Sequence, residues 1–144
     1  MSVDYSLRKA TFKHIESELY AYNETLKEID RLRTEIMAGG KIEIDENTMG
    51  GANSVREIGR PTERIATRLL THKTLRNLEE IATAINDVYN MVSDDHRKVI
   101  RLKYWYDRRL DWNGVADMAN MHRNTATKLR KEVVLLIADK IGWR

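Results

Sequence analysis

Basic and polar side chains crowd the segment 122–131, and their chemical types suit hydrogen bonding to DNA. Arg123 can pair through two hydrogen bonds with the edge of a guanine, Asn124 can do the same with adenine, and Thr127 can offer a hydroxyl or methyl group to thymine. The basic residues that follow are suited to phosphates. A short basic link lies upstream, around Arg108 and Arg109. Together with this link, the candidate DNA-binding residues are His122, Arg123, Asn124, Thr127, Lys128, Arg130, Lys131, Arg108 and Arg109.

Two helices joined by a tight turn must position these side chains. The stretch from Leu110 to Gly142 predicts a helix capped by Asp111, a sharp turn at Asn120 and a second helix after it. Asn tolerates the left-handed backbone conformation better than any residue except Gly. Apolar residues recur at helical spacing and are expected to face inward, at Val115, Ala116, Ala119, Ala126, Leu129, Val133 and Val134. This is the pattern of a helix-turn-helix that reads DNA.

Positive charge is concentrated at the same end of the chain. The net charge is +3, but residues 1–93 carry 13 Lys and Arg against 15 Asp and Glu, whereas residues 94–144 carry 12 against 7. Such an excess of positive charge would attract the phosphates of DNA. An ordinary helical hairpin with a solvated basic face would show the same charge run. The small residue Ala116, the turn residue and the apolar spacing together favour the DNA-binding motif.

The composition predicts an all-α protein without disulfides. The 144 residues include one proline, seven glycines and no cysteine, and no alternating apolar segment is long enough to build a sheet. The N-terminal sequence lacks the apolar stretch of a signal peptide, and no uncharged apolar run approaches the length of a membrane span. We therefore expect a soluble, cytoplasmic protein.

The polar residues outside this segment do not form a recognisable catalytic or metal site. A weak metal site at residues 94–96 is less favoured than the start of a helix, with Ser93 as its cap and two acids placed against the helix dipole. No HExxH motif or Ser-His-Asp order can be assembled from the histidines, which lie apart at His14, His72, His96 and His122. We expect no enzyme activity, no cofactor and no metal.

The rest of the chain is expected to divide into helical segments around a loop. The predicted parts are an N-terminal helical segment (1–37), a flexible glycine-rich loop (38–60), a long amphipathic helix (61–92) and the DNA-binding domain of three helices (93–144). In the N-terminal segment a helix break near Asn23 is an open alternative.

Apolar stripes run along the helices before the DNA-binding domain. In the N-terminal segment the apolar residues, among them Leu19 and Leu26, follow one another at alternating steps of three and four, as in a coiled coil. In the central helix Leu78 and Ile85 belong to a broader apolar face. Such stripes either pack within the chain or join copies of it. A homo-oligomer through the N-terminal and central helices is therefore expected.

The order of these segments resembles that of a known family. The C-terminal part of sigma factors, region 4, which reads the promoter −35 element, resembles the run SDDHRKVIRLKYW, a short basic link and LDWNGVADMANMHRNTATKLRKEVVLLIADKIG. The RinA/ArpU family of phage transcriptional regulators is similar to nearly the whole chain. Besides the C-terminal part, the similarity to this family covers the upstream segment YAYNETLKEIDRLRTEIM, the glycine-rich loop and the segment PTERIATRLLTHKTLRNLEEIATAINDVYNMV.

This resemblance implies a phage or prophage activator of late genes, including those for packaging and morphogenesis. It would act in the bacterial host cell on double-stranded promoter or operator DNA, without a cofactor, and it suggests contact with bacterial RNA polymerase. The family's recognition helix would correspond to residues 123–131. Ala126 is smaller than the branched residue common in the family, and Gly114 replaces an acidic residue. The alternatives are a small terminase-like DNA-packaging protein and a sigma-like RNA polymerase adaptor.

Overall fold

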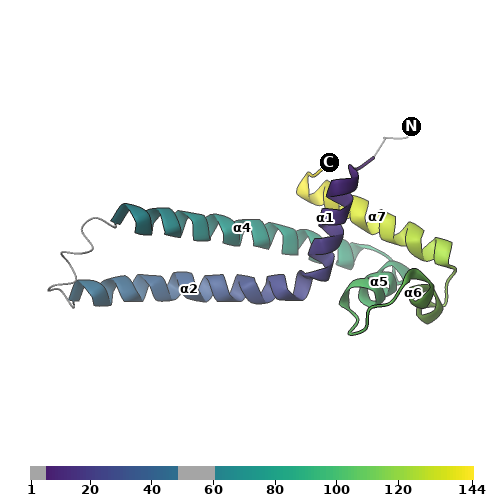
Figure 1. The fold of residues 1–144 in the computed structure, drawn as a ribbon, viewed down its shortest axis with the longest axis horizontal. Helices are drawn as coiled ribbons and strands as arrows, with labels where there is room; N and C mark the ends of the chain where they lie inside the picture. The colour runs from purple at the N-terminus through teal and green to yellow at the C-terminus, as the bar shows by residue number, and fades with distance from the viewer. Residues whose placement is uncertain (1–5, 49–60) are drawn as a thin grey trace. The chain divides into compact units, whose positions relative to one another are not determined.

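The computed structural model describes residues 6–48 and 61–144, and every regular element in that part of the chain is a helix (Figure 1). The predicted all-α fold is confirmed. None of the described helices is both long enough and apolar enough to cross a membrane. In chain order the elements are α1 (Lys9–Tyr20), α2 (Tyr22–Thr48), α4 (Pro61–Met91), α5 (Asp94–Ile100), the π-helix η1 (Arg101–Trp105), α6 (Trp112–Ala119) and α7 (Arg123–Ile141).

The first two helices are separated by a break at Ala21, close to the alternative predicted near Asn23. From there α2 continues to Thr48, so residues 38–48 are helical and the prediction of a loop is wrong for them. Gly39 and Gly40 lie within this part of α2. A glycine within a helix costs only about 1 kcal/mol relative to alanine, and the residues that follow the pair include several good helix formers. The remaining part of the predicted loop, 49–60, lies outside the described residues.

The chain packs as two units. Unit 1 comprises Met1–Asn23 and Glu80–Arg144, and unit 2 comprises Glu24–Glu79. Unit 1 therefore contains α1, the end of α4 and all later helices, whereas unit 2 contains most of α2 and the beginning of α4.

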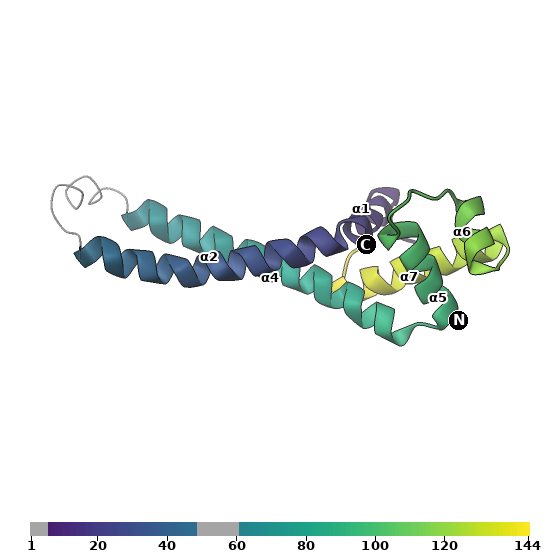
Figure 2. The same cartoon turned by 90° about the horizontal axis from the view of Figure 1, so that it is seen from below.

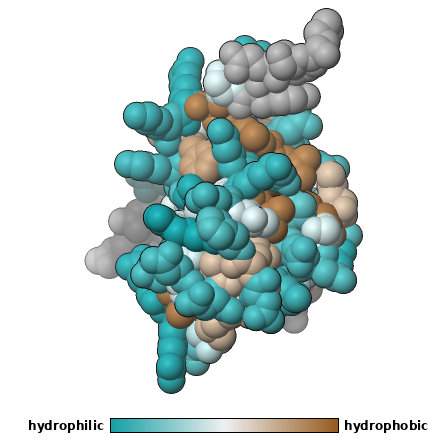
Figure 3. All heavy atoms as spheres, turned by 90° about the vertical axis from the view of Figure 1, so that its right-hand side faces the viewer, coloured by the Kyte–Doolittle hydropathy of each residue, from teal (hydrophilic) through white to brown (hydrophobic). Residues whose placement is uncertain are grey.

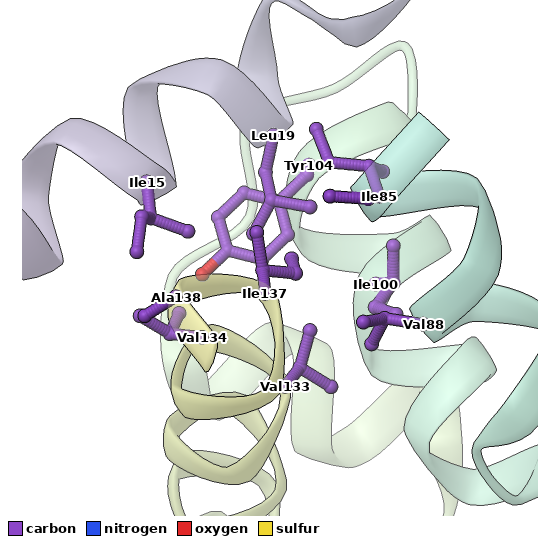
Figure 4. Packing of buried hydrophobic residues seen from close by; sticks show 11 residues of the cluster. Ile15, Leu19, Ile85, Val88, Ile100, Tyr104, Val133, Val134, Ile137 and Ala138 are labelled. Carbon is purple, nitrogen blue, oxygen red and sulfur yellow. The ribbon is translucent and has the colours of Figure 1, made fainter. Parts of the chain in front are cut away.

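The main core of unit 1 joins residues that are far apart in the sequence. Ile15 and Leu19 of α1 are fully buried, and Figure 4 shows them with aliphatic side chains of α4 and α7 around the ring of Tyr104. The stripe residues Leu19 and Ile85 thus pack within the chain here. The buried members of this core are Ile15, Leu19, Ala84, Ile85, Val88, Ile100, Tyr104, Val133, Val134, Ile137 and Ala138.

A smaller core connects α5, α6 and α7. Its buried members are aliphatic, and half-buried apolar side chains such as Leu102 and Leu129 pack around them. Of the residues predicted to face inward in α6 and α7, Leu129 is half-buried, and the others are buried: Val115, Ala116, Ala119, Ala126, Val133 and Val134. The small Ala116 and Ala126 allow the two helices to approach closely.

Polar contacts hold α1 against the rest of unit 1. The hydroxyl of Tyr104 donates to Oε2 of Glu16 at 2.6 Å, and Nη1 of Arg130 lies 3.4 Å from the same oxygen. The indole Nε1 of Trp105 donates to the carbonyl of Leu19 at 3.0 Å. Burial, followed by the hydrogen bond to Glu16, raises the pKa of Tyr104.

Unit 2 is a pair of helices. Its parts of α2 and α4 lie side by side and run in opposite directions (Figures 1 and 2). Ile29 and Leu32 are buried, and Nη2 of Arg33 donates across the pair to Oε2 of Glu79 at 2.7 Å. Several large apolar side chains are exposed, namely Leu26, Met37, Ile65, Leu69 and Leu70.

Candidate nucleic-acid interface

The interface begins with the start of α6. As predicted, Asp111 caps this helix, and its Oδ1 accepts a hydrogen bond from the backbone N–H of Gly114 at 2.8 Å. A Cβ atom at position 114 would lie 3.2 Å from that same oxygen, which is tighter than an ordinary contact. The glycine that departs from the family pattern therefore leaves room for the cap.

The turn between α6 and α7 is set by Asn120. Its backbone is left-handed, with φ 56° and ψ 48°, which confirms the conformation predicted for this residue. The N–H of Asn120 donates to the carbonyl of Asp117 at 3.3 Å, and that of Met121 donates to the carbonyl of Ala116 at 3.0 Å. Carbonyls that the end of α6 leaves unpaired are thereby satisfied.

The helix α7 starts from a side-chain cap supplied by His122. Its Nδ1 accepts a hydrogen bond from the backbone N–H of Asn124 at 3.1 Å. With Nδ1 occupied as an acceptor, the neutral ring carries its hydrogen on Nε2. The exposed edge of His122 can therefore donate a hydrogen bond outward.

The first half of α7 exposes most of the side chains predicted to read DNA. Thr127 is half-buried, and its hydroxyl donates to the carbonyl of Asn124 at 3.1 Å. Thr125 is not among the predicted DNA-binding residues, but it is also exposed and polar, and it lies in the first turn of the helix. We call the whole set the α7 face, and its members are His122, Arg123, Asn124, Thr125, Thr127, Lys128 and Lys131.

The surroundings of the α7 face are polar. Figure 3 looks onto the end of unit 1 where α7 begins in Figure 1, and it shows mostly hydrophilic side chains there, with smaller hydrophobic patches between them. A polar, positively charged surface is what binding to a phosphate backbone requires.

Arg130 differs from the other predicted DNA-binding residues, because its side chain is engaged within the chain. Its guanidinium carbon lies 4.8 Å from the ring centre of Trp112 and 5.2 Å from that of Phe12, and it pairs with Glu16. The side chain is only 27% exposed. Arg130 therefore links α1 to α7. Periodicity along α7 could not reveal this, since Phe12 and Glu16 are more than 100 residues away in the sequence.

The basic link before α6 holds the remaining two candidates. Arg108 is exposed, and Arg109 is exposed with its guanidinium 5.6 Å from the ring centre of Tyr20. Lys103 fixes the end of this link, because its Nζ donates to the carbonyl of Leu110 at 2.9 Å. Burial lowers the pKa of Lys103. Arg108 and Arg109 thus belong to a segment separate from α7.

Several acidic and histidine side chains of the described residues have structural roles. The described residues include no group of three metal-binding side chains that could hold an ion. As predicted, Ser93 caps α5 by accepting from the backbone N–H of His96. The ring of His96 contacts the hydroxyl of Ser93 through Nδ1 and the carboxylate of Glu132 through Nε2, at 2.6 and 2.7 Å.

The chain is similar to known proteins over most of its length. Residues 12–139 match a family described as "Protein of unknown function (DUF722)". The chain is also 25% identical over 138 residues to "Transcriptional activator rinA" of Staphylococcus phage phi11, covering 96% of this chain and 95% of that protein. These matches confirm the predicted resemblance to RinA-type proteins. No solved structure matches the chain.

Proposed function

The chain belongs to the DUF722 family, and we propose that it is a phage transcriptional activator that binds double-stranded promoter DNA through the α7 face. The observation that carries the proposal is the α7 face itself. Apart from the half-buried Thr127, its polar and basic side chains are exposed, and the opposite side of the helix is fixed in two cores. In this arrangement α6, Asn120 and α7 act as a helix-turn-helix that places α7 in the major groove.

The roles within the α7 face follow from hydrogen-bonding geometry. Arg123 pairs with a guanine edge and Asn124 with an adenine edge, while His122 donates from Nε2 to a base or phosphate acceptor. The threonines offer hydroxyl or methyl groups to bases. Phosphates are held by Lys128 and Lys131, together with the exposed cations of the basic link, Arg108 and Arg109.

The regulatory part of the proposal rests on similarity. The relative that spans almost the whole chain is named a transcriptional activator of a phage, which favours activation over DNA packaging. We include late genes as the target and RNA polymerase as a contact, because the resemblance to RinA/ArpU regulators implies them. No catalytic step is part of this function.

The decisive experiment is footprinting on DNA from the protein's own genomic neighbourhood, with RNA polymerase present and absent. Arg123→Ala and Asn124→Ala should each weaken binding by about 5- to 150-fold, or about 1–3 kcal/mol, and relax base preference at one or two positions. Lys128→Ala should weaken binding uniformly and lower the salt dependence by about one counterion.

Lys140→Ala is the matched control, since it removes an exposed lysine from the last turn of the same helix. It should leave the footprint unchanged. Failure of the wild-type protein to protect any site would contradict the proposal. So would Arg123→Ala and Asn124→Ala variants that keep full affinity and base preference.

A further inference from the structure

Unit 1 has an open groove that is separate from the residues of the α7 face. It has a volume of about 490 Å³, and its lining comes from α5, η1, the basic link and α6. The lining residues are Lys98, Arg101, Leu102, Trp105, Tyr106 and Met118. Four of these, at positions 98, 101, 102 and 105, follow helical spacing and so form one stripe along α5 and η1.

The apolar part of the groove combines a fixed wall with accessible side chains. Trp105 is held by its hydrogen bond to Leu19 and by stacking on Tyr22, with ring centres 5.1 Å apart. In contrast, Tyr106 is 40% exposed and Met118 is 50% exposed. Such a surface can cover an apolar side chain without first rearranging its own core, which favours binding.

The charged side chains that line the groove are all positive. Its lining includes two cations and no carboxylate. Within residues 6–48 and 61–144, neither Lys98 nor Arg101 has a carboxylate within ion-pair distance, and the guanidinium of Arg101 donates to the hydroxyl of Tyr89 at 2.7 Å. By contrast, the neighbouring Arg97 is paired with Asp94 at 2.9 Å.

We propose that this groove binds an acidic amphipathic helix of a partner protein. A large apolar side chain of that helix lies against Trp105, Tyr106 and Met118, and its carboxylates lie beside Lys98 and Arg101. This is helix-in-groove recognition, with apolar anchors for contact and complementary charge for orientation. The proposal goes beyond DNA reading and does not require it.

DNA is the other polyanion that the two cations could meet. A phosphate backbone, however, offers nothing to cover Leu102, Tyr106 and Met118, whereas interfaces between proteins are enriched in aromatic side chains and methionine. The groove combines these apolar side chains with the cations Lys98 and Arg101, and this combination favours a protein helix over DNA as its partner.

The test uses the full chain and a synthetic helical peptide of about 18 residues, long enough to form a helix, with a leucine and phenylalanine stripe flanked by glutamates. Labelled methionine methyl groups are followed by NMR while the peptide is added, and its affinity is measured by fluorescence anisotropy. The methyl signal of Met118 should shift, whereas that of Met91 should not. A peptide with lysines in place of the glutamates should bind at least tenfold more weakly.

Matched variants locate the site. Met118→Glu and Lys98→Glu should each weaken peptide binding at least tenfold. Met91→Glu and Lys140→Glu should not, although Met91 is 56% exposed, close to the exposure of Met118. Circular dichroism shows whether each variant is folded. Lys98→Glu tests the groove even if Met118→Glu unfolds the protein.

Three results would overturn the proposal: no binding of the acidic peptide, equal binding by the Lys98→Glu variant, or a shift of the Met118 signal by duplex DNA but not by the peptide. Loss of DNA binding in the Arg123→Ala variant with peptide binding intact would separate the two surfaces.

Discussion

Unit 1 and unit 2 are both helical, but they are stabilised in different ways. Unit 1 buries residues from α1, α4 and α7 in one core and ties them with hydrogen bonds to Glu16 and from Trp105. Unit 2 exposes several large apolar side chains, and the segment 24–79 contains no phenylalanine, tyrosine or tryptophan. Precise placement of the α7 face is thus a property of unit 1, while unit 2 carries apolar surface that is available for the predicted association of copies.

The largest contrast is expected from truncating a leucine in each unit. Leu19→Ala should lower the free energy of unfolding by about 2–5 kcal/mol, because it leaves a cavity in the core of unit 1. Leu69→Ala should change it by about 0.5 kcal/mol or less, because Leu69 is 65% exposed. Urea denaturation followed by circular dichroism measures both values.

An equal loss for the two variants would show that Leu69 stabilises unit 2 as much as Leu19 stabilises unit 1. If the loss for Leu69→Ala appeared only at high protein concentration, a second copy would be covering that side chain. Sedimentation at the same concentrations would test this directly.

A smaller contrast is expected between carboxylates. Glu16→Gln should cost about 1.5–3 kcal/mol, because Glu16 accepts from Tyr104 and pairs with the largely buried Arg130. Glu79→Gln should cost about 1 kcal/mol or less, because its pair with Arg33 is exposed to solvent. Denaturation of the two variants side by side, at low and high salt, gives the values. A larger loss for Glu79→Gln would assign the main polar stabilisation to unit 2.

The smallest effect concerns alkaline pH. Burial and the hydrogen bond to Glu16 raise the pKa of Tyr104 above its ordinary value of 10.0, so the folded protein holds this proton more tightly than the unfolded chain. The resulting stability is complete below pH 10 and is lost as the pH rises further, by at most about 1.4 kcal/mol per pH unit. Tyr104→Phe should show a shallower decline of unfolding free energy between about pH 9 and pH 11. An identical slope in both proteins would refute this role of Tyr104.

Local features were predictable from the sequence because their causes lie within a few residues. The caps at Ser93 and Asp111 each bond to a backbone N–H three residues ahead, and Asn120 adopts the left-handed conformation that its own side chain tolerates. The inward and outward sides of α7 followed from helical periodicity, which depends only on neighbouring turns. The fold class and most of the exposed positions of the α7 face can therefore be predicted from the sequence.

Features that depend on distant residues were not predictable in this way. Arg130 is a residue type that often contacts phosphates, but its side chain is held by Phe12 and Glu16 of α1. The groove beside Met118 likewise depends on how α6 packs against η1, and helical spacing alone does not give that packing. The extension of α2 through Gly39 has a local cause instead, because a glycine in a helix costs only about 1 kcal/mol and good helix formers follow it, so the glycine-rich composition predicted a loop wrongly.

Unit 1 is built from segments near both ends of the chain, and this determines when during synthesis it can fold. Ile15 and Val133 belong to the same core but are about 120 residues apart, and ribosomes add about 5–20 residues per second, so roughly 6 to 24 s separate their synthesis. During that interval Ile15 and Leu19 have no native cover from α7. Chaperones that recognise exposed apolar helices therefore have a window in which to act on the nascent chain, and that window closes only after α7 has left the ribosome.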